Sequence, residues 1–225
     1  MARLERAHAV ATLPLTTGPG TDKTLPDDLL TALFAGRDTI YAILDGGRIE
    51  GLQERLEALD LPRACLCAGQ MVEDAGEMAP WLVELTPEST LLHRILCDLP
   101  DDAAAIHGLM RRGPGIFLRT NLPMPELRTH LRRFLRVMDA NNQPFFFRFW
   151  EPEAAAAYFQ SISDRSETVI RWMCPRDTSS IIEAIMIPTW IDGAALVCMT
   201  PQDLPDAPPP ARGAFVLTRP DIAAL

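Results

Sequence analysis

The chain has 225 residues, 48% of them hydrophobic, and a formal net charge of −9. That length and composition suit one sizeable folded core, and the acidic balance argues against a general binder of nucleic acid or of anionic membranes. No apolar run approaches the roughly 18 residues of a membrane span, and His8, Thr12 and Pro14 interrupt any signal-peptide core, so we expect a cytoplasmic protein.

The five cysteines form an odd set without framework spacing and lie mostly among apolar neighbours, which favours reduced, buried thiols. Cys65 and Cys67 are separated by one residue, whereas a structural zinc site usually has two pairs with a spacing of two to four. The four histidines do not pair with each other or with the cysteines at ligand spacing. We therefore expect neither a metal nor another cofactor.

Charge is segregated along the chain. Residues 41–110 hold 13 acidic residues against 4 arginines, whereas residues 111–150 hold 8 arginines against 2 acidic residues. An acidic half followed by a basic block can be complementary within one fold, or it can form two docking surfaces. The counts leave both possibilities open.

Residues 1–38 form a partly flexible lead-in that ends in a short helix, which Asp27 or Asp28 could cap. After it, hydrophobic periodicity predicts strands at 39–44, 63–67, 81–85, 115–120 and 145–150, and helices at 49–59, 91–96, 103–110 and 126–138. Strands that alternate with helices indicate an α/β domain, here at 39–160. We expect a mixed central sheet of about five strands covered by helices.

Residues 161–225 are expected to form a smaller C-terminal lobe. Short helices are predicted at 153–160 and 166–173, at the end of the α/β domain and the start of this lobe. Two apolar runs at 183–190 and 194–199 flank an Asp-Gly turn and predict a β-hairpin. The proline-rich segment 201–213 is expected to be extended or a disordered linker.

The segment 126–152 combines a basic amphipathic helix with a very aromatic strand. Leu127, Leu131, Phe134, Leu135 and Met138 follow the spacing of one apolar helix face. The aromatic residues of 145–150 are expected in the core, so stacking with single-stranded nucleic acid is not favoured.

Four arginines of the same segment lie off the apolar face: Arg128, Arg132, Arg133 and Arg136. A solvated face is the usual meaning of such a run. The alternatives are an acidic protein partner or the chain's own acidic half. We treat the four as a hypothetical partner-binding surface.

Asp45 is the best catalytic candidate, because it ends a strand before Gly46-Gly47, where open α/β sheets often carry catalytic groups. The segment lacks the second acid of a phosphoaspartate-type site and the glycine spacing of a nucleotide-binding loop. The favoured interpretation is a turn in which Asp45 binds backbone amides or an arginine. We therefore expect no catalytic residues.

Arg119 and Arg148 each lie late in an apolar strand, where an unpaired charge would be costly. Asp45, Glu84 and Glu151 are the expected partners, in ion pairs that stabilise the sheet.

Seven ordered segments over about residues 39–160 resemble the type VI secretion effector adaptors, a family of domains of unknown function also called effector chaperones. Glu151-Pro152 follows Trp150 where the family usually has tyrosine, aspartate and proline. The matching segments are YAILDGGRI (41–49), LPRACLCAG (61–69), PWLVEL (80–85), LLHRIL (91–96), GIFLRT (115–120), LRTHLRRFLRV (127–137) and FFFRFWEP (145–152).

The resemblance implies a non-enzymatic, cytoplasmic bacterial protein that binds a cognate effector toxin and loads it onto the VgrG spike. From the acidic net charge we expect no nucleic-acid partner and no membrane partner. Two alternatives stay open: a hydrolytic or phosphoryl-transfer enzyme that uses Asp45 at the sheet edge, and an immunity protein that neutralises a toxin.

Overall fold

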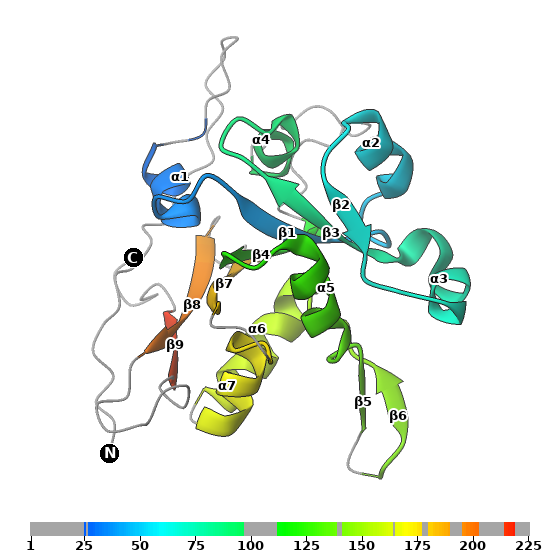
Figure 1. The fold of residues 1–225 in the computed structure, drawn as a ribbon, viewed down its shortest axis with the longest axis vertical. Helices are drawn as coiled ribbons and strands as arrows, with labels where there is room; N and C mark the ends of the chain where they lie inside the picture. Colours follow the sequence, from blue (N-terminus) through cyan, green and yellow to red (C-terminus); the bar gives the residue numbers. More distant parts are fainter. Residues whose placement is uncertain are drawn as a thin grey trace.

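The computed structural model describes residues 25, 27–96, 112–138, 141–163, 165–176, 180–189, 195–202 and 214–218. Its elements are labelled in Figure 1. In chain order they are α1 (Asp27–Phe34), β1 (Ile40–Asp45), α2 (Leu52–Ala58), β2 (Arg63–Cys65), α3 (Gln70–Ala75), the 3₁₀ helix η1 (Gly76–Met78), β3 (Pro80–Leu85), α4 (Thr90–Leu96), β4 (Gly115–Thr120), α5 (Met124–Arg132), β5 (Arg136–Met138), β6 (Pro144–Phe146), α6 (Pro152–Ile162), α7 (Ser166–Met173), β7 (Ile182–Thr189), β8 (Ala195–Gln202) and β9 (Ala214–Thr218).

Seven strands form one sheet in the order β2-β3-β1-β4-β7-β8-β9. The predicted α/β class is confirmed, but each neighbouring pair in this sheet is antiparallel, so the sheet is not mixed. A chain in which helices alternate with strands can form a parallel or an antiparallel sheet. The strand pairing makes this sheet antiparallel, because β1 lies between β3 and β4 and both run opposite to it.

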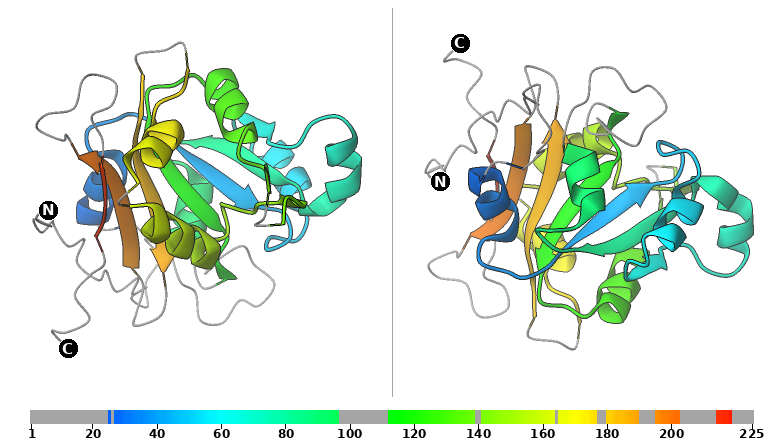
Figure 2. Two further views of the ribbon diagram at one scale, coloured as in Figure 1. Left: turned by 90° about the horizontal axis from the view of Figure 1, so that it is seen from below. Right: turned by 90° about the horizontal axis from the view of Figure 1, so that it is seen from above.

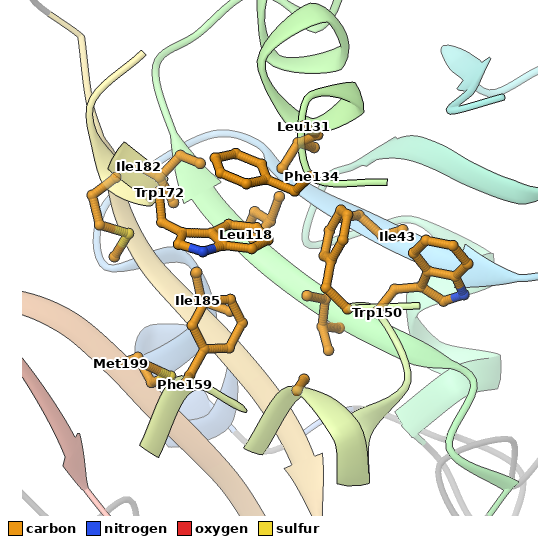
Figure 3. Close-up of a cluster of buried hydrophobic side chains, with 14 of the residues drawn as sticks. Ile43, Leu118, Leu131, Phe134, Trp150, Phe159, Trp172, Ile182, Ile185 and Met199 are labelled. Carbon is orange, nitrogen blue, oxygen red and sulfur yellow. The ribbon is translucent and has the colours of Figure 1, made fainter. Parts of the chain in front are cut away.

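Helices cover both faces of the sheet, with α6 and α7 in front in one view of Figure 2 and α4 in front in the other. On β1, Ile40, Ala42 and Leu44 belong to a first core with α1, α2 and α4. Tyr41 and Ile43 belong to a second core with α5, α6 and α7, shown in Figure 3. Burial on both faces explains why this strand is an almost continuous apolar run.

The predicted C-terminal hairpin exists, but it extends the main sheet and does not form a separate lobe. β7 pairs with β4, and β8 pairs with β7. Ile185 and Ile187 lie in the second core, whereas Ala184 and Met186 lie in the first. β7 is therefore buried on both faces, as expected for a strand inside a sheet that helices cover on both sides.

The aromatic strand predicted at 145–150 is not part of the main sheet. β6 pairs with β5 in a separate two-stranded ribbon, and the place beside β4 is taken by β7. Phe145 and Phe146 are exposed, whereas Phe149 and Trp150 turn back into the second core. The run therefore divides between surface and core.

The predicted helix at 126–138 is also shorter than expected. α5 ends at Arg132. After it the backbone hydrogen bonds join residues only three apart, for example from the Phe134 amide to the Leu131 carbonyl at 3.0 Å. Its apolar residues up to Leu135 are buried as predicted, but Met138 is exposed on β5. The apolar residues of this segment are therefore buried only where they contact the second core.

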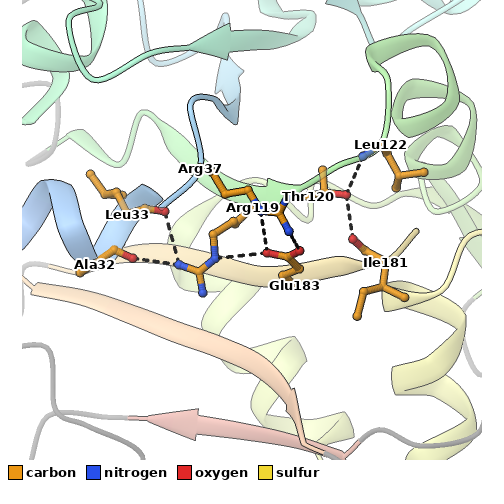
Figure 4. A network of polar contacts seen from close by, with 8 residues as sticks. All are labelled: Ala32, Leu33, Arg37, Arg119, Thr120, Leu122, Ile181 and Glu183. Carbon is orange, nitrogen blue, oxygen red and sulfur yellow. Dashed lines mark hydrogen bonds and ion pairs between the residues drawn. The ribbon is translucent and has the colours of Figure 1, made fainter. Parts of the chain in front are cut away.

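Arg119 joins α1 to the sheet, as Figure 4 shows. Its Nη1 donates to the carbonyls of Ala32 and Leu33, at 3.0 and 3.4 Å, near the end of α1. Its Nε lies 3.7 Å from Glu183 Oε2, and Glu183 also forms an ion pair with Arg37. The free carbonyls of a helix end thus receive donors.

Within the described ranges, no helix is long and apolar enough to cross a membrane. The predicted helix at 103–110, most of the lead-in and residues 203–213 of the proline-rich segment lie outside those ranges.

Candidate functional site

Asp45 ends β1 with its carboxylate buried and both oxygens engaged. Oδ1 accepts a hydrogen bond from the Gly47 amide at 2.9 Å, and Oδ2 forms an ion pair with Arg148. The Asp45 side chain is 1% exposed and that of Arg148 is 42% exposed. This arrangement fixes the turn after β1 and joins it to the segment that follows the ribbon.

The other residues expected in ion pairs have different partners. Glu151 pairs with Arg48 at 2.6 Å on the surface. Arg119 lies beside Glu183, an acidic residue that was not among the expected partners. Glu84 lies opposite Tyr41 across β1 and β3. Burial, and then the Glu84 carboxylate, raise the pKa of the Tyr41 hydroxyl.

Arg128 is occupied by its own chain. Its Nε donates to the Cys65 carbonyl at 2.6 Å and its Nη2 to the Cys67 carbonyl at 3.0 Å. The Leu66 amide bonds inward to β3, so the Cys65 carbonyl points to the free edge of the sheet. Arg128 therefore covers a sheet edge, which limits pairing with other chains.

The other three arginines of the predicted surface, Arg132, Arg133 and Arg136, are exposed. Arg132 and Arg133 lie where α5 ends, and Arg136 begins β5. The four do not form one helical row, because the chain leaves the helix after Arg132.

Cys65 and Cys67 are free cysteines separated by one residue. A hydrogen bond from Cys67 is the main reason why the pKa of Cys65 falls to about 7, and Arg128 and Arg132 lower it further. No cluster of three or more metal-ligand side chains occurs among the described residues.

A groove of about 460 Å³ lies between α3–η1 and the β5–β6 ribbon, two elements that project on the same side of Figure 1. This volume is within the range of ligand-binding pockets. The lining residues are Met71, Asp74, Ala75, Met78, Arg136, Pro144, Phe145, Phe146, Arg148 and Trp150.

Gly46 sets one wall of this groove. A Cβ at Gly46 would collide with the carbonyl oxygens of Glu77 and Ala79, so only glycine lets η1 pack this closely against the turn after β1. Gly46, the residue directly after Asp45, thus positions η1.

Large apolar side chains are exposed on both walls. Met78 is 63% exposed, Phe145 46% and Phe146 40%. Single exposed apolar residues are common, but several around one concave surface indicate a binding site. Methionine and aromatic residues are also enriched at protein interfaces.

The two walls carry opposite charges. Asp74 lines the α3 side, and Glu73 and Glu77 are exposed on α3 and η1. Arg136 lines the ribbon side. Arg132 and Arg133 are exposed near the end of α5 but do not line the groove. The groove is therefore apolar between a carboxylate on the α3 side and a guanidinium on the ribbon side.

Trp150 lines the groove, but its indole nitrogen is buried. Its side chain is 1% exposed, and among the described residues its Nε1 has no hydrogen-bond partner. Figure 3 shows this nitrogen pointing away from the buried cluster. A buried donor without a partner is rare and requires an explanation.

The sequence patterns do not indicate this groove. They place Phe145 and Phe146 in the core and suggest no role for Met71 and Met78. The available signal was the number of aromatic residues in succession, since a strand of a small ribbon cannot bury side chains on both of its faces.

The family model described as Domain of unknown function (DUF4123) matches residues 40–168, more than half of the chain. The groove lies wholly inside the matched segment. Neither the curated proteins nor the solved structures gave a match.

Proposed function

This chain belongs to the DUF4123 family, and we propose that it is a non-enzymatic, cytoplasmic adaptor of a bacterial type VI secretion system. It binds a cognate effector toxin and delivers it to the VgrG spike. The exposed apolar groove between α3–η1 and the ribbon carries the proposal, because it offers a site for a protein partner inside the family domain. The resemblance of seven ordered segments to effector adaptors supports the same role.

The charge distribution favours protein partners. Exposed Arg132, Arg133 and Arg136 lie within an acidic chain and can accelerate encounter with an acidic partner surface. Arg128 is excluded from this surface, since it binds the β2 edge.

The geometry of Asp45 favours a structural role for this residue. Its carboxylate is buried and is bonded to Gly47 and Arg148, as expected for an aspartate that holds a turn. We therefore assign Asp45 to the scaffold of the groove and not to catalysis.

The test is co-expression of the chain with the toxin encoded beside it and with the C-terminal region of the spike, followed by a three-way pull-down. We expect the tagged chain to capture both, and the toxin to need the chain for recovery with the spike. Capture of neither partner, when both are folded, contradicts the proposal. Capture of the toxin without the spike, together with protection of cells from that toxin, identifies an immunity protein instead.

A further inference from the structure

The groove carries three features that together describe its occupant. Its floor and walls are apolar, through Met71, Met78, Phe145 and Phe146. Asp74 lines one wall and Arg136 the other. Arg148 and Trp150 also line it.

An amphipathic helix has the same sequence of surfaces: an apolar stripe between two polar flanks. Helices of this kind bind grooves through apolar residues at one-turn spacing. Flexible methionine and phenylalanine side chains can adjust around the apolar stripe. Walls of opposite charge then select the direction of the helix, because reversal would place each flank against like charge.

We infer that the groove binds an amphipathic helix of the toxin, with an acidic flank against Arg136 and the ribbon and a basic flank against Asp74 and α3. This inference rests on the proposed function and adds the chemistry of the partner. An acidic side chain of the first flank lies beside Arg148, which also lines the groove.

The first arm of the test uses synthetic helices. Three fluorescein-labelled peptides of about 18 residues share one stripe of leucine and phenylalanine: one has glutamate on one flank and lysine on the other, one has glutamate on both, and one has lysine on both. Fluorescence anisotropy with the full chain should show about fivefold tighter binding of the mixed peptide than of either other peptide. Equal binding of the three would overturn the inference.

Two substitutions sharpen this arm. Arg136→Glu makes both walls acidic and should transfer the preference to the lysine peptide, whereas Arg171→Glu, at an exposed arginine on α7, should leave it with the mixed peptide. An unchanged preference of the Arg136→Glu chain for the mixed peptide overturns the assigned flanks.

The second arm uses the pull-down with the toxin and the spike region. Met78→Ser with Phe146→Ser should abolish capture of the toxin and retain capture of the spike, whereas Ile181→Ser, which changes an exposed apolar residue outside the groove, should retain both. If the double variant still captures the toxin, the groove assignment is wrong and the adaptor function stands. If the wild-type chain captures neither partner, the adaptor function fails and the inference about the toxin falls with it.

Discussion

Arg128 and Arg132 lie about one turn apart near the end of α5, but their surroundings differ. Arg128 donates to two carbonyls at the β2 edge, whereas the Arg132 side chain is exposed. Two arginines that occupy equivalent positions in the helical pattern therefore have different roles. The difference arises because Arg128 contacts β2, which lies more than 60 residues earlier in the chain. The spacing of residues within one helix gives no information about such a distant contact.

We predict that Arg128→Gln lowers the free energy of unfolding by about 1–3 kcal/mol, because it removes two charge-assisted hydrogen bonds from partly buried carbonyls. Arg132→Gln, the matched control, should change it by less than about 0.5 kcal/mol, as is usual for exposed positions. Urea denaturation of the three chains measures both values. Equal effects of the two substitutions would contradict the role assigned to Arg128.

The β5–β6 ribbon is stabilised by contacts at its base. Only three residue pairs form it, and an isolated two-stranded ribbon is marginal in water. Its base is held by the Phe147 amide, which donates to the Leu135 carbonyl at 2.8 Å, and by the Phe147 ring against Tyr158 and Phe149. The ribbon can therefore expose Phe145 and Phe146 without being part of the core.

Substitutions within the run 145–149 should separate binding from stability. Phe145→Ser with Phe146→Ser should shift the melting temperature by no more than a few degrees, because both rings are exposed. Phe149→Ala should lower the free energy of unfolding by about 3–5 kcal/mol, because that ring is fully buried in the second core. Thermal melts followed by circular dichroism give the comparison. A large fall in the melting temperature of the double variant would show that the ribbon belongs to the core.

At the scale of the whole molecule, the sheet continues past the end of the matched family segment. Residues 40–168 supply β1 to β4, while the β4 edge is covered by β7 and the second core is completed by residues such as Trp172 and Ile185. Trp172 stacks on Phe134 with ring centroids 3.7 Å apart. The family segment and the residues after it share one core.

We therefore predict that a fragment of residues 1–168 does not fold cooperatively. Removal of β7 exposes the apolar β4 edge, and removal of Trp172 opens the second core over Phe134 and Phe159. Thermal unfolding followed by near-ultraviolet circular dichroism, with the full chain as reference, tests this expectation. A fragment that melts in one sharp transition within a few degrees of the full chain would show that the matched segment is a domain by itself.

The sequence by itself determined the α/β class, most element positions and the expectation that Asp45 holds a turn. These follow from local periodicity and from the cost of an unpaired buried charge. Only the tertiary structure decided the antiparallel directions, the place of the hairpin in the main sheet, the occupation of Arg128 and the groove. Each of these depends on which distant segments meet, and a single residue pattern such as Phe145 to Trp150 is compatible with core and surface until the partner of each side chain is known.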